Sequence, residues 1–242
     1  DEDGLVNGII VDPGMLADTG KTPGQTSLKD HDGVPANVEL ATFNHDFNRD
    51  GVEDWDQGAI AQLPLASLDA YLQGVDAPQA SFGVVMVGKV DATAPIGARI
   101  DANGQLLGVS VVGVDAAAMP AHTRMATPML EVKAAPADGA KSLTDVDPMR
   151  EGLQTQIMVS LQTGVKANAF MLLDPVSKGW FDYTNEYAKD GSAEGAALLD
   201  LNNDGLVDAV VITVTDAGIA DDDVTLNGVV SLHGMLVWQD GH

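Results

Sequence analysis

The stretch "DAVVITVTD" at residues 208–216 decides the fold. Apolar and β-branched residues run without interruption between two Asp residues. A run of this length and composition is typical of a buried strand. The stretch "SFGVVMVGKV" at 81–90 has the same character, so we expect a second buried strand there.

Short apolar runs of this kind recur along the chain, with Gly, Asp, Asn and Pro between them. Besides 81–90 and 207–214, the expected strands cover 5–11, 105–114, 129–132, 154–161, 167–173 and 227–238. A helical turn is expected only within "DWDQGAIAQL" at 54–63. Many short strands at this spacing predict an all-β fold, in one or more β-sandwich modules with little helix.

The composition indicates a folded and strongly acidic protein. Hydrophobic residues make up 45% of the 242 residues, which is enough for a core. The 36 acidic residues outnumber the 12 basic ones, and the net charge of −24 repels nucleic acids and anionic membranes. No apolar run approaches the length of a membrane-spanning helix. The lack of Cys suits an exported bacterial protein without disulfides, although it fits the cytosol equally well.

The chain repeats one phrase, as "DEDGLVNGIIVDPGML" at 1–16 and "DDDVTLNGVVSLHGML" at 221–236. Two turns of similar composition that arose independently are one explanation. We favour a tandem repeat of about 220 residues, in which 1–16 is the tail strand of a preceding copy. The identical positions are Asp1 and Asp221, Asp3 and Asp223, Asn7 and Asn227, Gly8 and Gly228, Gly14 and Gly234, Met15 and Met235, and Leu16 and Leu236.

A loop-like segment at 115–146 divides the rest of the chain. It suggests an acidic segment with a β subdomain at 17–134 and a second β-sandwich subdomain at 135–242. One sandwich with a long crossing connection is the alternative.

The stretch "DFNRDGVEDWD" at 46–56 has the spacing of a calcium loop. Such a loop places oxygen ligands at alternate positions, a Gly at position 6 and a backbone carbonyl at position 7, so that six to eight oxygens converge on one ion. Position 12 is Gln57 instead of the bidentate Glu of an EF-hand. The candidate ligands are Asp46, Asn48, Asp50, the Val52 carbonyl, Asp54 and Asp56.

Three further stretches carry weaker forms of this pattern. An Asx-rich turn without a metal is the alternative for each loop, and a solvated acidic turn for 221–223. Magnesium is disfavoured because it rarely occupies all-protein cages. The candidates are Asp200, Asn202, Asp204, Leu206 and Asp208 in "LLDLNNDGLVD"; Asp30, Asp32, Val34 and Glu39 in "LKDHDGVPANVE"; and Asp221 and Asp223 with their echoes Asp1 and Asp3.

The stretches "DHDGVPANVE" and "DFNRDGVEDWDQ" resemble the Asp-rich loops of thrombospondin type 3 and related bacterial calcium repeats. The segments "GWFDYT", "GAALLD" and "VVITVTDAGIADDDVTLNGVV", with "DEDGLVNGIIVDPG", resemble the choice-of-anchor U domain of exported bacterial surface proteins. The resemblance covers about 150–234 and 1–14, and departs from the family pattern at "SLHG" (231–234) and at Ile219 and Ala220. It implies a surface-displayed β module without catalytic activity.

No metalloprotease, serine hydrolase or phosphate-binding motif occurs in the sequence, so we expect no enzyme. The sequence predicts a calcium-stabilised structural repeat module of a large extracellular or cell-surface bacterial adhesin. Its expected partners are neighbouring copies of the repeat, with host or matrix glycans or proteins as further candidates. The alternatives are a calcium-dependent glycan- or peptide-binding module, and a filament or sheath subunit that assembles by strand exchange through 5–11.

Overall fold

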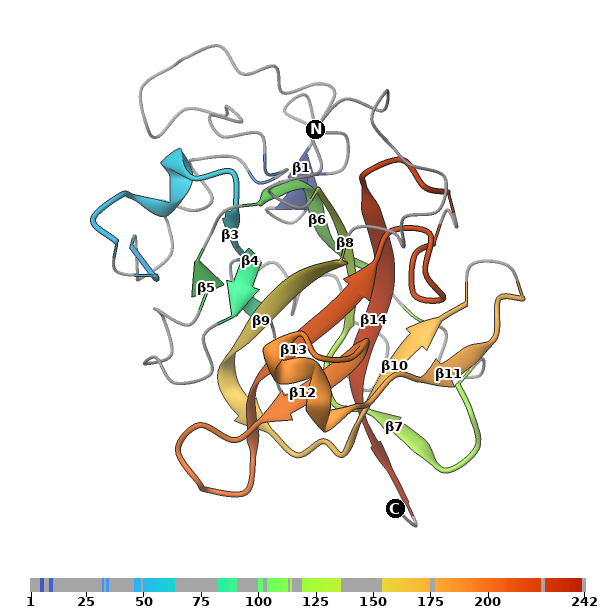
Figure 1. The fold of residues 1–242 in the computed structure, drawn as a ribbon. Helices are drawn as coiled ribbons and strands as arrows, with labels where there is room; N and C mark the ends of the chain where they lie inside the picture. The colour runs from blue at the N-terminus through green and yellow to red at the C-terminus, as the bar shows by residue number, and fades with distance from the viewer. Residues whose placement is uncertain are drawn as a thin grey trace.

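The computed structural model describes residues 5–6, 9–10, 32, 34, 46–48, 50–63, 82–90, 100–101, 104–112, 114, 119–135, 154–174, 177–222 and 225–240. These residues form an all-β fold in which two larger antiparallel sheets face each other as a sandwich (Figure 1). Helical structure in the described part of the chain is limited to short 3-10 turns, among them η2 (Asp54–Asp56) and η5 (Glu186–Asp190). The predicted fold class is confirmed.

The first sheet has the strand order β11-β10-β14-β8-β6, and β7 also pairs with β14. Its central strand, β14, pairs with β8 over 230–234 and with β7 over 237–239 on one side, and with β10 over 234–237 on the other. The strands are β6 (Gln105–Val112), β7 (Thr123–Met125), β8 (Met129–Ala135), β10 (Ala169–Leu173), β11 (Trp180–Asp182) and β14 (Val230–Gln239).

The second sheet has the strand order β12-β13-β9-β4-β3, and β5 pairs with β4. Every pairing in it is antiparallel, so the direction of the chain alternates from strand to strand. The strands are β3 (Ile60–Gln62), β4 (Phe82–Val90), β5 (Ile100–Asp101), β9 (Gln154–Val165), β12 (Gly195–Leu199) and β13 (Val207–Thr215).

Both sheets contain strands from both sides of residue 134. In the second sheet β4 pairs with β9, and in the first sheet β8 pairs with β14. Strand pairing therefore crosses the boundary expected between 134 and 135, and the two larger sheets form one sandwich.

The expected strand at 5–11 is instead two short strands, β1 (Leu5–Val6) and β2 (Ile9–Ile10). They pair antiparallel, with Leu5 opposite Ile10 and Val6 opposite Ile9. The two residues between them in the sequence are Asn and Gly, the pair that most favours a tight hairpin. A single extended strand was therefore the wrong expectation for this segment.

The core lies between the two sheets. Its largest fully buried side chains include Phe170, Leu130 and Leu232 from the first sheet and Ile157 and Ile212 from the second. In β13 every residue from 209 to 214 is buried, because the outer face of the strand is also covered, in part by η5. Burial on both faces explains why this strand has an unbroken apolar sequence.

The two sheets also meet at their sides. On one side the Leu106 N–H of β6 donates to the Gly58 carbonyl before β3, at 2.6 Å. On the other side Thr184, just after β11, forms a parallel bridge with Ala196 of β12. Joining the sheet edges in this way reduces the unpaired backbone available to another chain. In the described part of the chain, no helix has the length and apolar character needed to cross a membrane.

Candidate metal centres

The loop at 46–56 is organised by hydrogen bonds from its own backbone to its Asx side chains. The Asp50 N–H donates to Asp46 Oδ1 at 3.1 Å and to Asn48 Oδ1 at 3.2 Å. The Gly51 N–H donates to Asp46 Oδ2 at 3.2 Å, and the Val52 N–H to Asp50 Oδ1 at 2.8 Å. Gly51 has φ +88°, a left-handed conformation that favours Gly at position 6.

The loop at 200–208 repeats this arrangement at the same positions. The Asp204 N–H donates to Asp200 Oδ1 at 3.2 Å and to Asn202 Oδ1 at 2.9 Å. The Gly205 N–H donates to Asp200 Oδ2 at 2.9 Å, and the Leu206 N–H to Asp204 Oδ1 at 2.8 Å. Gly205 has φ +85°, close to the value at Gly51.

The Asp at position 9 closes both loops by the same contact. Asp54 accepts the Phe47 N–H at 3.1 and 3.2 Å, and Asp208 accepts the Leu201 N–H at 2.8 Å. Two segments that are 154 residues apart therefore share one local fold, because the same residue types stand at positions 1, 3, 5, 6 and 9.

The two loops differ in their surroundings. Asp54 is only 1% exposed and also accepts a hydrogen bond from the side chain of Gln62 in β3. Burial raises the pKa of Asp54 to about 6, and the hydrogen bonds from Phe47 and Gln62 oppose that rise only in part. Its counterpart Asp208 is half-buried, beside Gly164 near the end of β9, where an added Cβ would come within 2.9 Å of Asp208 Oδ1.

Gln57, at position 12, reaches back into the first loop. Its side-chain amide donates to Asp50 Oδ1 at 3.2 Å and to the Val52 carbonyl at 3.0 Å. These two acceptors are candidate ligands, so the amide holds the oxygens of positions 5 and 7 together. Asp56, at position 11, is exposed on the 3-10 turn η2.

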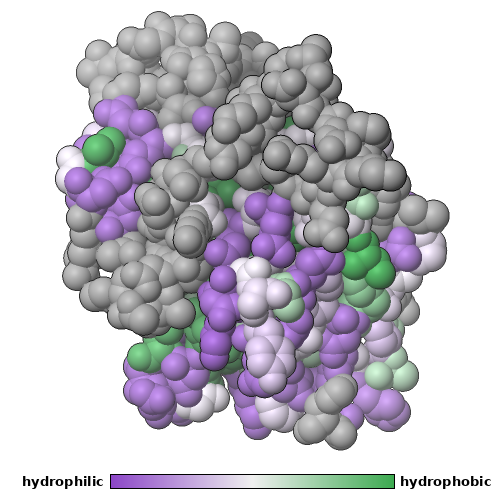
Figure 2. All heavy atoms as spheres, in the orientation of Figure 1, coloured by the Kyte–Doolittle hydropathy of each residue, from purple (hydrophilic) through white to green (hydrophobic). Residues whose placement is uncertain are grey.

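The donor set of each loop suits a hard cation. Carboxylates, one side-chain amide and one backbone carbonyl supply only oxygen, which is the ligand type that Ca²⁺ prefers. Within the described ranges, however, no group of three or more Asp, Glu or His side chains comes together as a metal cluster. Several carboxylate oxygens are turned toward the N–H groups of their own loop. Figure 2 shows hydrophilic surface where the two loops lie, at the upper left and the lower left of the view.

The remaining candidates have other surroundings or lie outside the described residues. Asp32 is fully buried and accepts the Val34 N–H at 2.7 Å, and Val34 is buried too. Asp221 is also fully buried; its two oxygens accept the Ala217 N–H at 2.8 Å and the Ser231 N–H at 3.0 Å. Asp221 thus fastens the turn after β13 to β14. The candidates outside the described residues are Asp1, Asp3, Asp30, Glu39 and Asp223.

A charged cluster that the sequence did not predict lies beside this turn. His233 of β14 contacts Asp222 through Nδ1, and its Nε2 lies 3.7 Å from Glu131 Oε1 on β8. The hydrogen bond to Asp222 raises the pKa of His233 above its ordinary value, and burial opposes it. Glu131 also accepts a hydrogen bond from Ser110 at 3.0 Å. No sequence motif relates these residues, because the pairing of β6, β8 and β14 brings them together.

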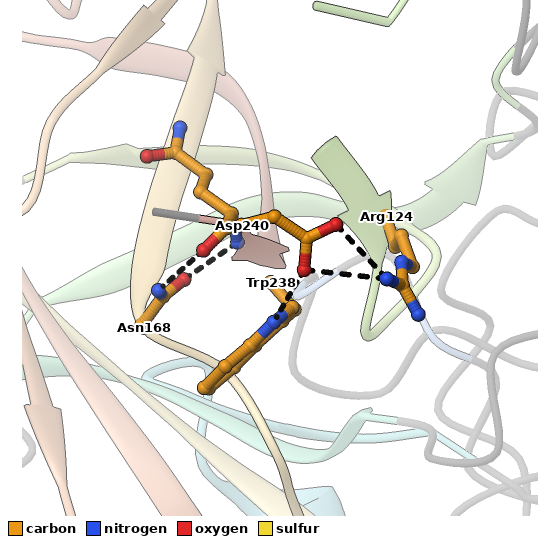
Figure 3. A network of polar contacts seen from close by, with 5 residues as sticks. Arg124, Asn168, Trp238 and Asp240 are labelled. Carbon is orange, nitrogen blue, oxygen red and sulfur yellow. Dashed lines mark hydrogen bonds and ion pairs between the residues drawn. The ribbon is translucent and has the colours of Figure 1, made fainter. Parts of the chain in front are cut away.

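A second polar network fastens the far end of β14 (Figure 3). Asn168 exchanges two hydrogen bonds with the Gln239 backbone, at 2.9 and 2.7 Å. Asp240 accepts Arg124 at 2.9 Å and the Trp238 indole at 3.1 Å, and the Arg124 hydrogen bond lowers the pKa of Asp240. The network anchors the strand end.

Comparison of the chain with protein-family models, with curated proteins and with solved structures finds no match. The family resemblance and the metal expected from the sequence therefore stay predictions.

Proposed function

We propose that this chain is a calcium-stabilised structural module of an extracellular bacterial surface or secreted protein, with neighbouring modules as its partners. The observation that carries the proposal is the duplication of one calcium-type loop at opposite ends of a single sheet. The proposal assigns the module no catalytic role.

The antiparallel order of the second sheet supports the opposite placement. β3 pairs antiparallel with β4, β4 with β9 and β9 with β13, so β3 and β13 run in opposite directions. Each loop immediately precedes one of these strands. The loop at 46–56 therefore lies at the end of the sheet where β9 begins, and the loop at 200–208 at the end where β9 finishes (Figure 1). A module with a rigid loop at each end is suited to holding its neighbours at a fixed angle.

Electrostatic repulsion is the reason to expect a cation. The net charge of −24 opposes a compact state, and each loop gathers carboxylates at alternate positions. Bound Ca²⁺ would supply positive charge to oxygens of Asp46, Asn48, Asp50 and Val52, or of Asp200, Asn202, Asp204 and Leu206. Extracellular modules bind calcium at about 10⁻⁴ to 10⁻³ M, a range suited to the outside of a cell. At about 1 mM calcium, affinities in this range would stabilise the folded state by roughly 0.4 to 1.4 kcal/mol per site.

The test is thermal melting of the whole chain in chelator and in millimolar calcium. Calcium is expected to raise the melting temperature by several degrees, at about 2 to 4 °C per kcal/mol for a chain of this size. The double variants Asp46→Asn/Asp50→Asn and Asp200→Asn/Asp204→Asn should each lose part of the increase. Asn preserves the Oδ1 acceptors of positions 1 and 5 but loses the Oδ2 that accepts the Gly N–H, so these variants remove charge and keep most of the hydrogen bonds of the turn.

Asp190→Asn is the matched control. Asp190 caps an exposed turn through the Ser192 N–H at 2.9 Å, and no calcium-type spacing surrounds it. This variant should keep the whole calcium response. Equal melting curves in chelator and calcium would refute the proposal, as would double variants that respond to calcium like the wild-type chain.

The two alternatives have less support in the described residues. Assembly through sheet edges is disfavoured by the joined corners at Leu106 and at Thr184. Calcium-dependent glycan binding would be favoured over the structural role by reproducible hits on a glycan array that disappear in chelator.

A further inference from the structure

The outer face of the first sheet carries a second apolar cluster, separate from the core between the sheets. Three of its members are buried methionines: Met129 is 7% exposed, Met171 3% and Met235 0%. Met119 and Met125, both half-buried, pack against it. Five of the nine methionines of the chain thus gather on this face.

The strand register explains how the buried methionines meet. Met171 of β10 is the direct cross-strand partner of Met235 of β14. On the other side of β14, Gly234 is the partner of Leu130 in β8. Because the two strands are antiparallel, the next residue of β14, Met235, lies opposite the preceding residue of β8, Met129. Directly opposed side chains lie about 5 Å apart at Cβ, so the three thioethers form one row across three strands.

The segment 119–128 borders this row beside β14, with Met119 and Met125 packed against the cluster. β7 within it pairs with β14, and the Ala126 and Thr127 N–H groups donate to the Leu236 carbonyl at 2.9 and 3.2 Å. The Leu236 N–H returns a hydrogen bond to the Thr127 hydroxyl at 3.0 Å. The segment is thus held by backbone contacts to one strand and by the packing of Met119 and Met125.

Methionine is the only sulfur residue of the chain, because Cys is absent. Peroxide oxidises a thioether at a rate that depends on the accessibility of the sulfur, and the sulfoxide product is polar. We propose that Met119 and Met125 form a peroxide-sensitive modification site, and that their oxidation loosens the segment 119–128 and opens Met129, Met171 and Met235 to the same reaction.

The reaction is a two-electron oxygen transfer from hydrogen peroxide. The sulfur lone pair attacks one peroxide oxygen, the O–O bond breaks, a sulfur–oxygen bond forms, and the second oxygen leaves as water after proton transfer. The new sulfoxide oxygen requires a hydrogen-bond donor or water, and an apolar cluster offers neither. The oxidised side chains therefore favour the state in which the segment 119–128 has separated from β14.

The structure supplies internal controls. Met86 of β4 and Met158 of β9 are also cross-strand partners, but both are fully buried against the second sheet, far along the chain from the segment 119–128. The proposal predicts three stages of oxidation: Met119 and Met125 first, then Met129, Met171 and Met235 after a lag, and Met86 and Met158 only when the whole fold opens.

The experiment is a time course of the intact chain in hydrogen peroxide, quenched with catalase and mapped by peptide mass spectrometry. The double variant Met119→Leu/Met125→Leu keeps side-chain volume and apolarity, so it should fold. In this variant the oxidation of Met171 and Met235 should slow by about tenfold, because the segment 119–128 no longer loosens. Met86 and Met158 should react at the same rate in both proteins.

Two results would overturn the proposal. One is oxidation of Met171 and Met235 at the same rate in the wild-type chain and the double variant. The other is an unchanged amide exchange rate at Ala126, Thr127 and Leu236 after Met119 and Met125 have been oxidised. Neither result depends on whether calcium binds, because the peroxide series is carried out in chelator.

Discussion

The loops at 46–56 and 200–208 have the same local fold but different electrostatics. Five kinds of hydrogen bond recur at the same positions, and both Gly residues at position 6 have nearly the same φ. The Asp at position 9 is buried under β3 in the first loop and half-buried beside β9 in the second. The motif thus determines the path of the backbone, while the tertiary neighbours determine how readily its carboxylates ionise.

The largest expected difference between the loops is in pH dependence. Because the pKa of Asp54 is raised from 3.8 to about 6, its folded state holds a proton more tightly than the unfolded chain does. In chelator, the free energy of unfolding should therefore fall as the pH rises from about 4 to 6. A shift of this size corresponds to roughly 3 kcal/mol at most, and residual solvent contact reduces it.

Asp54→Asn should remove this part of the pH dependence, and Asp208→Asn should leave it unchanged. Urea unfolding between pH 4 and pH 7.5 measures both. His233 also makes the free energy of unfolding fall as the pH rises, because its pKa is raised in the folded state. The quantity to compare is therefore the difference in pH dependence between each variant and the wild-type chain. Parallel pH profiles for the wild-type chain and Asp54→Asn would mean that the first loop is as solvated as the second.

A smaller and equal effect is expected at position 6 of the two loops. Gly51 and Gly205 both have positive φ, and a Cβ added at either would meet no atom within 4 Å. Gly51→Ala and Gly205→Ala should each lower the free energy of unfolding by about 1 to 2 kcal/mol through backbone strain alone.

Gly108→Ala in β6 is the control, because it also has open space but no positive φ. Chemical denaturation of the three variants tests the comparison. Unequal losses at Gly51 and Gly205 would contradict the conclusion that the loops share one backbone conformation.

The smallest effect concerns calcium affinity at position 12. Gln57→Glu would restore the carboxylate of the EF-hand pattern and should raise the calcium affinity of the first loop by roughly threefold. The second loop has no equivalent test, since its position 12 is the fully buried Val211 of β13. Calorimetric titration of Gln57→Glu should therefore show one improved site. A uniform change at all sites, or none, would argue against calcium in this loop.

The features that the sequence predicted are local ones. The buried strand at 207–214 follows from its unbroken apolar run, and the duplicated loops follow from the spacing of Asp, Asn and Gly. The short strands β3, β7, β11 and β12 were missed because three to five residues carry too little pattern. The 3-10 turn η5 was missed as well; it begins at an Asn185 cap and ends at Gly191.

The features that the sequence did not predict depend on pairing between distant strands. His233 meets Glu131 only because β14 lies beside β8. Met171 meets Met235 only because β14 also lies beside β10. The acidic turn near 221 was interpreted either as a cation site or as solvated, and its first Asp is instead fully buried. The sequence did contain one sign that this turn is part of the folded structure, namely its place in the repeated phrase. The residues of the phrase that occur here are Asp221, Asn227, Gly228 and Gly234. Of these, Gly234 lies so close to Phe170 that an added Cβ would come within 2.5 Å of the ring.

The pairing of β14 on both sides has a mechanical consequence. A pull along the axis of this strand loads its backbone hydrogen bonds to β10, β8 and β7 in shear, so they resist together instead of opening one at a time. The bidentate contact of Asn168 with Gln239 and the ion pair of Arg124 with Asp240 extend that resistance to the last described residues. We therefore expect this strand to resist tension applied along its length.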